Sequence, residues 1–187
     1  MSDFIDDRRR ALEEAFFARQ DAEILRKMRG GDAPDTRQEA LSAASGITDS
    51  DLLGKLSGLG VDSGTLAALS LVPLVAVAWA DGTLEARERE AVLSAAHQSG
   101  IDRQAPSYQL LQGWLASAPP PELLTAWSDY IRATSSRLGA DGRQALKLQI
   151  LGRARRVAEA AGGLLGIGAV SAAEQAVLSR LETDFSV

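Results

Sequence analysis

Hydrophobic residues recur every three or four positions along almost the whole chain, which is the spacing of one helix face. Strong helix formers dominate, and the alternation of β-branched residues that marks a strand is scarce. The pattern therefore predicts an all-α fold, a multi-helix bundle. The expected helices cover about residues 3–29, 36–44, 49–59, 63–80, 85–99, 107–116, 120–138, 144–161 and 171–185.

Three short sequences predict tight turns between successive helices. Each consists of a glycine, a β-branched aliphatic residue and a potential capping residue. Glycine can adopt the left-handed conformation that ends a helix, the aliphatic residue packs on the last turn, and Thr or Asp accepts the first free amides of the next helix. The turns favour a bundle of helical hairpins over an α/β fold. They are Gly46-Ile47-Thr48, Gly60-Val61-Asp62 and Gly100-Ile101-Asp102.

One clear boundary divides the chain, because Gly30-Gly31 ends the first expected helix and is followed by the linker-like sequence Ala33-Pro34-Asp35. We expect residues 1–31 to form an N-terminal helical extension. Residues 32–62 are expected to hold two short connecting helices, and residues 63–187 to form the main bundle. Pro73 lies inside a strong helical pattern and predicts a kink there.

The amino-acid composition excludes most kinds of catalytic site. The 187 residues include no cysteine and one histidine, His97, which excludes disulfide scaffolds, thiolate nucleophiles, zinc thiolate sites and iron–sulfur clusters. Any metal would be a hard cation held by oxygen ligands. His97 precedes a helix-ending glycine and is expected to interact with the helix dipole rather than to act as a ligand or base.

Charge and hydropathy limit the expected partners and location. The formal net charge of −5 argues against general nucleic-acid binding, which usually requires a strongly basic face. The longest apolar run, residues 66–80, is interrupted by Ser70 and Pro73 and is shorter than the roughly 20 residues of a membrane-spanning helix. Residues 1–10 are charged and lack the apolar stretch of a signal peptide. We therefore expect a cytoplasmic protein with no membrane insertion.

The segment that begins Asp81-Gly82 and reaches Glu88 is the best candidate for chemistry. The aspartate-to-glutamate spacing matches the second half of an EF-hand loop, but Val77 and Trp79 occupy the earlier ligand positions and cannot bind an ion. A smaller calcium or magnesium site with fewer oxygen ligands than an EF-hand is still compatible with the spacing. The alternative is that Gly82 ends one helix and the acidic residues only begin the next.

A similar segment near the C-terminus indicates a weak internal pseudo-twofold repeat. Gly168, Val170 and Glu174 have the spacing of Gly82, Leu84 and Glu88, and Ala176-Val177-Leu178-Ser179 resembles Ala91-Val92-Leu93-Ser94. Ile167 stands where an acidic residue would match Asp81. Ser171-Ala172-Ala173-Glu174 has the pattern of a capping box, so a second metal site is not expected.

Together these motifs resemble the tellurite-resistance TerB-like family. The resemblance covers about residues 63–185 and is carried by Val75 to Gly82, Glu88-Arg89-Glu90, Val157 to Gly163 and Val170 to Glu174. It leaves the N-terminal helical extension outside, as in a bacterial subset of that family. It implies an all-helical bundle with internal pseudo-symmetry, a role in stress-response assemblies and acidic residues able to hold a divalent metal. By position, these metal ligands are Asp81, Glu88 and Glu174.

The expected function is a non-catalytic module that binds an unidentified protein partner, with a weak divalent-cation site. Homo-oligomerisation is compatible with the sequence. The alternative is a purely structural interaction bundle without metal, and a carboxylate–metal hydrolase is a distant third. Glu85, Glu88 and Glu90 are expected to form a solvated acidic face, and Trp79, Trp114 and Trp127 to lie in the core. The basic residues Arg143, Lys147, Arg153, Arg155 and Arg156 are expected to be solvated and paired with acidic neighbours rather than to bind phosphate.

Overall fold

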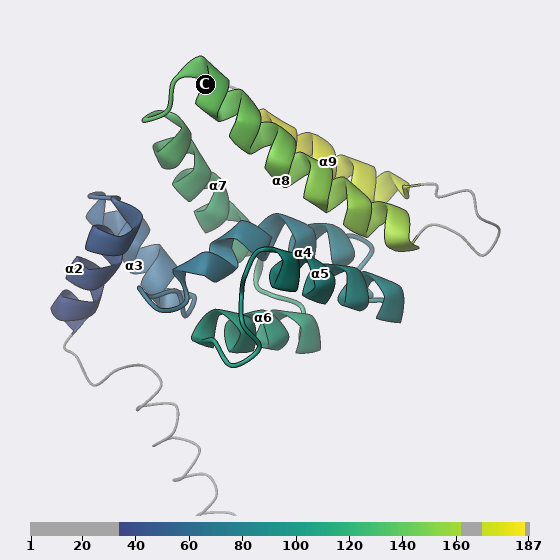
Figure 1. The fold of residues 1–187 in the computed structure, drawn as a ribbon, viewed down its shortest axis with the longest axis horizontal. Coiled ribbons are helices and arrows are strands. Elements are labelled where there is room, and N and C mark those ends of the chain that lie inside the picture. The colour runs from purple at the N-terminus through teal and green to yellow at the C-terminus, as the bar shows by residue number, and fades with distance from the viewer. Residues whose placement is uncertain (1–33, 162–169, 186–187) are drawn as a thin grey trace, which may run out of the picture. The chain divides into compact units, whose positions relative to one another are not determined.

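The computed structural model describes residues 34–161 and 170–185, and all regular structure in these ranges is helical (Figure 1). The all-α prediction is therefore confirmed for this part of the chain. The chain divides into two compact units, residues 1–36 and 37–187. The expected helix over residues 3–29 lies outside the described residues, as does Ile167. No described helix is long and apolar enough to cross a membrane.

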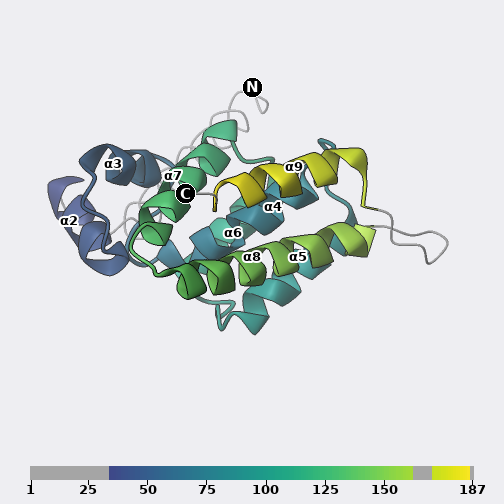
Figure 2. The same ribbon diagram turned by 90° about the horizontal axis from the view of Figure 1, so that it is seen from above.

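Helix α4 is at the centre of the second unit. It contacts α5, α7, α8, α9 and the short 3₁₀ helix η1. Helices α8 and α9 lie side by side over α4, as Figures 1 and 2 both show. The elements are α2 (Pro34–Ser45), α3 (Ser50–Gly58), η1 (Leu66–Leu71), α4 (Val72–Ala78), α5 (Ala86–Gln98), α6 (Pro106–Ala116), α7 (Pro121–Ser135), α8 (Ala140–Ala161) and α9 (Ala172–Thr183).

The predicted glycine turns are confirmed. Gly46, Gly60 and Gly100 have φ angles of +71°, +83° and +77°, and the aliphatic residue after each of them is buried. The N–H of Val61 donates to the carbonyl of Leu56 at 3.0 Å, and Ile101 repeats this bond with Ala96 at 3.1 Å. These bonds satisfy carbonyls that the helix end leaves free. The expected caps are wrong. Asp49, not Thr48, caps α3 through the N–H groups of Asp51 and Leu52. Asp62 and Asp102 accept N–H groups only of turn residues that precede η1 and α6.

The helix expected over residues 63–80 is two helices. Residues 66–71 form η1, and α4 begins at Val72 with Pro73 in its first turn. Proline lacks a donor N–H, which interrupts the interior of a helix but is harmless in the first turn. The proline therefore begins a new helix instead of kinking a continuous one.

The expected tryptophan positions are confirmed. Trp114 and Trp127 are buried, and Trp79 packs partly buried against the same core. The indole N–H of Trp79 donates to the carbonyl of Trp114 at 2.9 Å, which satisfies its polar group inside an apolar environment. This hydrogen bond connects the C-terminal end of α4 to the last turns of α6.

One buried acid that the sequence analysis did not single out joins α7 to the end of α9. Asp184 is 3% exposed. Its carboxylate accepts a hydrogen bond of 2.7 Å from the Ser128 hydroxyl and forms an ion pair with Arg132. No local sequence rule relates residues that lie more than 50 positions apart, so this contact depends on the tertiary fold alone.

Candidate metal site

Glu88 and Glu174 occupy equivalent positions, each being the third residue of its helix. Glu88 Oε2 accepts the backbone N–H of Glu85 at 2.8 Å at the start of α5. Glu174 Oε2 accepts the N–H of Ser171 at 2.6 Å at the start of α9, and the N–H of Glu174 donates to the Ser171 hydroxyl at 3.2 Å. The predicted capping box at Ser171–Glu174 is therefore confirmed, and Glu88 makes the matching bond in the other hairpin.

Both glutamates are buried, with 5% of each residue exposed. The expectation that Glu85, Glu88 and Glu90 form one solvated face is therefore wrong for Glu88, although Glu85 and Glu90 are exposed. The reason is the capping bond, which turns the Glu88 side chain back over the start of its own helix. The Glu-x-x-Glu spacing of Glu85 and Glu88 is the signal that could have revealed this.

The buried carboxylates are close enough to influence one another. Burial raises the pKa of Glu88, and the negative charges of Glu174, Asp81 and Glu85 raise it further. The hydrogen bond from the Glu85 N–H opposes this rise without reversing it. The structure therefore brings Glu88 under the influence of both other predicted ligands.

One oxygen of this pair has no partner among the described residues. Glu174 Oε1 is buried and makes no hydrogen bond to residues 34–161 or 170–185. An unsatisfied buried polar atom costs on the order of 1–3 kcal/mol, and more when it carries charge. A cation, a water molecule or a proton held between the carboxylates would each satisfy this oxygen.

Asp81 lies at the surface and interacts with its own turn. Its Oδ1 accepts hydrogen bonds of 2.9 Å from both the backbone N–H and the hydroxyl of Thr83, and these bonds lower the pKa of Asp81. The next residue, Gly82, has a φ of +88°, which is the left-handed conformation that the sequence pattern predicts. The turn is therefore shaped by local bonds that need no ion.

The three predicted ligands do not form a complete ligand set. Over residues 34–161 and 170–185, no group of three or more histidine, aspartate or glutamate side chains is placed to hold one metal ion. The Glu88 and Glu174 pair alone nevertheless has suitable chemistry. A hard divalent cation such as Mg²⁺ is often bound by one or two carboxylates, with water molecules as its remaining ligands.

The pKa of Glu88 leads to a prediction about stability and pH. A raised pKa means that folding favours the protonated form, so this stabilisation is complete at acidic pH and is lost as the pH rises through the folded-state pKa. The hydrogen bond from the Glu85 N–H favours a negative charge at this position, but burial and the neighbouring acids outweigh it. Without the charge, Glu88→Gln should be more stable than wild type at pH 7.

Thermal or urea unfolding in chelator-treated buffer from pH 3.5 to 8 tests this prediction. The advantage of Glu88→Gln should shrink as the pH falls through the raised folded-state pKa of Glu88, and it should be gone below the ordinary glutamate value of about 4.3. Glutamine retains an oxygen that can accept the Glu85 N–H. Glu90→Gln is the matched control, because it removes an exposed charge from the same helix. A difference in the free energy of unfolding between Glu88→Gln and wild type that stays the same at all pH values would contradict the prediction.

The remaining polar predictions have mixed outcomes. His97 lies in the last turn of α5, the position expected for a partner of the helix dipole. Lys147 forms an ion pair with Glu182 at 2.8 Å, as expected for the basic helix. The half-buried Arg153 instead donates to the Ser99 hydroxyl at 2.8 Å.

Comparison of the chain with protein-family models, curated proteins and solved structures gives no match.

Proposed function

We propose that this chain is a non-catalytic, protein-binding helical module that holds one divalent cation between the first turns of α5 and α9. The observation that carries the proposal is the buried, unpartnered Glu174 Oε1 beside the like-charged Glu88. A cation would satisfy this oxygen and neutralise the repulsion between the two carboxylates at once. Asp81 would contribute through its charge.

The ligand set fits calcium or magnesium bound weakly. Each glutamate uses one carboxylate oxygen for its helix cap and keeps a second oxygen for an ion. Two carboxylates cannot replace the whole hydration shell, so water would complete the coordination. When bound, the ion would link the starts of two helices and stiffen that end of the bundle. The proposal includes no catalysis, because the lone imidazole, His97, lies at the opposite end of α5 from Glu88.

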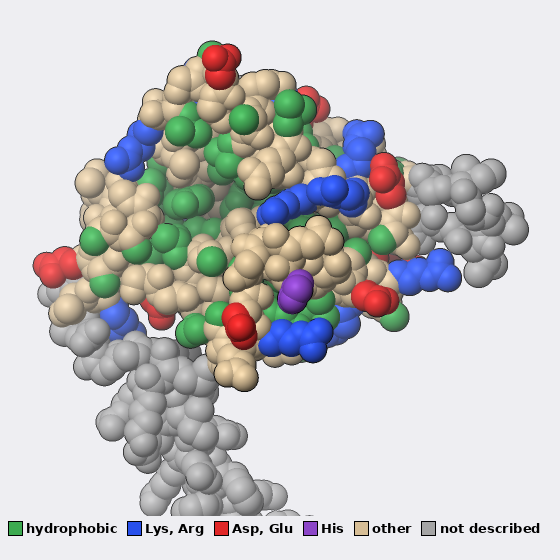
Figure 3. Space-filling view, viewed as in Figure 1, with side chains coloured by type: hydrophobic (Ala, Val, Ile, Leu, Met, Phe, Trp, Pro, Cys, Tyr) green, Lys and Arg blue, Asp and Glu red, His purple; other side chains and the backbone are tan. Residues whose placement is uncertain are grey.

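An apolar groove supports the protein-binding part of the proposal. It has a volume of about 510 Å³ and is lined by residues of η1, α7 and α8, with the Ser99–Ile101 turn at one side. Hydrophobic side chains gather in a hollow over α7 on the face shown in Figure 3. The resemblance to TerB-like proteins favours a partner within a stress-response assembly.

Calorimetric titration of Mg²⁺ and Ca²⁺ tests the cation site, with the melting temperature as a second measurement. Wild type should release or absorb heat and melt at a higher temperature at millimolar cation. Glu174→Gln should lose both effects, and Asp81→Ala should weaken them. Glu182→Gln should keep both, because Glu182 lies on the same helix but is exposed and pairs with Lys147. Absence of heat and of a melting shift in wild type would overturn the proposal.

The alternative function is a purely structural bundle whose acids only cap helices and shape a turn. The complete capping box at Ser171–Glu174 and the Asp81–Thr83 turn favour it, because both satisfy the polypeptide without an ion. The two functions differ at Glu174 Oε1. In the structural alternative, a water molecule or a proton would satisfy this oxygen. The cation titration would then give no heat and no melting shift in wild type or in any variant.

A further inference from the structure

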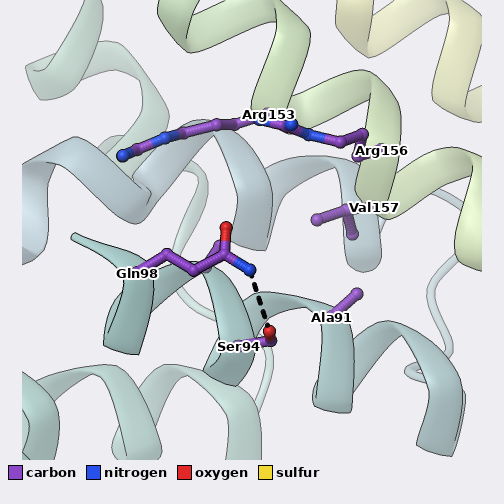
Figure 4. A pocket seen from close by; sticks show the side chains of 7 residues that line it. Ala91, Ser94, Gln98, Arg153, Arg156 and Val157 are labelled. Atoms are coloured by element: carbon purple, nitrogen blue, oxygen red, sulfur yellow. Dashed lines mark hydrogen bonds between the residues drawn. The ribbon is translucent and has the colours of Figure 1, made fainter.

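A small pocket between α5 and α8 is lined by basic residues. Arg153 and Arg156 line it from α8, and Ser94 and Gln98 line it from α5 (Figure 4). Its volume is about 170 Å³. Sites for drug-sized ligands usually measure roughly 300–1,000 Å³. The pocket is therefore suited to a small ion or to one chemical group of a larger molecule.

No acidic side chain lines this pocket. Arg153 and Arg156 are three residues apart on α8 and share one face of the helix, where their like charges repel. The other lining residues, Ser94, Gln98 and three small apolar side chains, carry no charge. Among the described residues, neither arginine forms an ion pair with a carboxylate, in contrast to Lys147 on the same helix. The expectation of acidic partners therefore fails at these two positions.

The polar groups of the pocket offer hydrogen-bond donors. Arg153 uses one guanidinium N–H to donate to Ser99, which holds its side chain toward the C-terminal end of α5, and a guanidinium has five N–H donors in all. Gln98 Nε2 donates to the Ser94 hydroxyl oxygen at 3.3 Å. Ser94 is the acceptor in that bond, so its own hydroxyl proton remains available. Two arginine side chains and one hydroxyl that line the pocket therefore keep hydrogen-bond donors for a ligand.

We infer that this pocket binds the phosphoryl group of a small phosphate monoester or of free phosphate. A phosphoryl group presents three strongly accepting oxygens, which matches the three donor side chains. A carboxylate presents two oxygens, which a single arginine can bind in a bidentate manner, so it would leave one arginine uncompensated. Ala91, Ala95 and Val157 form an apolar wall on one side of the pocket, and they offer no hydrogen-bond groups that would compete with the two arginines.

Calorimetry with inorganic phosphate, methyl phosphate and acetate on the full chain tests the inference. Wild type should bind both phosphates at millimolar concentration or below and acetate at least tenfold more weakly. Tighter binding of methyl phosphate would identify a monoester as the preferred ligand, and equal or tighter binding of inorganic phosphate would identify the free ion. Arg156→Gln should weaken phosphate binding at least tenfold, as should Arg153→Gln. Arg155→Gln makes the same charge change outside the pocket and should change the phosphate affinity by no more than about twofold.

Ser94→Ala provides an independent test without a change in charge, and it should weaken phosphate binding several-fold. Arg156 is exposed and makes no hydrogen bond to a described residue, so Arg156→Gln should fold as wild type does even if Arg153→Gln does not. Circular dichroism and melting without ligand check this. No phosphate binding by wild type, or an equal loss in Arg155→Gln and Arg156→Gln, would overturn the inference.

Discussion

Trp127→Ala should lower the free energy of unfolding by about 3–5 kcal/mol, the usual cost of truncating a large buried aromatic side chain. Trp127 is 1% exposed on α7, and its ring meets the Phe185 ring edge-on at a centroid distance of 6.3 Å. The substitution would open a cavity that the surrounding helices can only partly close. It would also remove the aromatic contact between α7 and the C-terminal end of α9.

Urea unfolding followed by circular dichroism at pH 7 measures this loss independently of tryptophan fluorescence. Leu148→Ala is the control, because Leu148 is the most exposed large hydrophobic residue of the described chain and should change stability by less than about 0.5 kcal/mol. A loss below about 1 kcal/mol for Trp127→Ala would show that Trp127 does not occupy the core position assigned to it.

Asp184→Ala should cost about 2–3 kcal/mol, which is the range for a buried, charge-assisted hydrogen bond. The substitution removes the acceptor for the Ser128 hydroxyl and the ion-pair partner of Arg132. The loss stays below that of a fully buried ion pair, because Arg132 is half exposed and can be hydrated. Ser128 also retains a second acceptor, the carbonyl of Leu124 at 3.0 Å.

Asp129→Ala is the matched control for Asp184→Ala. Asp129 lies near the same arginine, at 3.9 Å from Arg132 Nη1, and pairs with Lys55 at 3.1 Å, but these contacts are partly exposed. Ion pairs of this kind contribute about 0–1 kcal/mol. Equal losses for the two aspartates in the same unfolding experiment would contradict a special role for the buried acid.

The helix ends could be predicted from the sequence because they obey local rules. Gly60 and Gly100 each end a helix in the left-handed conformation, and the residue after each packs on the preceding turn. Ser171 and Glu174 form the capping box that their spacing indicates. These features depend on a few consecutive residues, so the sequence contains most of the information needed.

The site could be predicted only in part, because its important properties arise from packing between distant segments. Asp81, Glu88 and Glu174 were identified, but the burial of the two glutamates depends on how the hairpins pack together. The unpartnered Glu174 Oε1 has the same origin. The pocket at Arg153 is a third case, since its α5 and α8 side chains lie more than 50 residues apart in sequence. The proposed internal repeat stays a prediction.

The central claim is that Glu88 and Glu174 form a buried pair of like charges that a divalent cation neutralises. The most direct test is carbon-13 NMR titration of the glutamate side-chain carboxyls, in chelator and then in millimolar Mg²⁺ or Ca²⁺. We predict that the pKa of Glu88 lies above the ordinary glutamate value in chelator and falls when the cation is added, since a cation favours the charged carboxylate. An ordinary pKa in chelator that the cation leaves unchanged would contradict the claim.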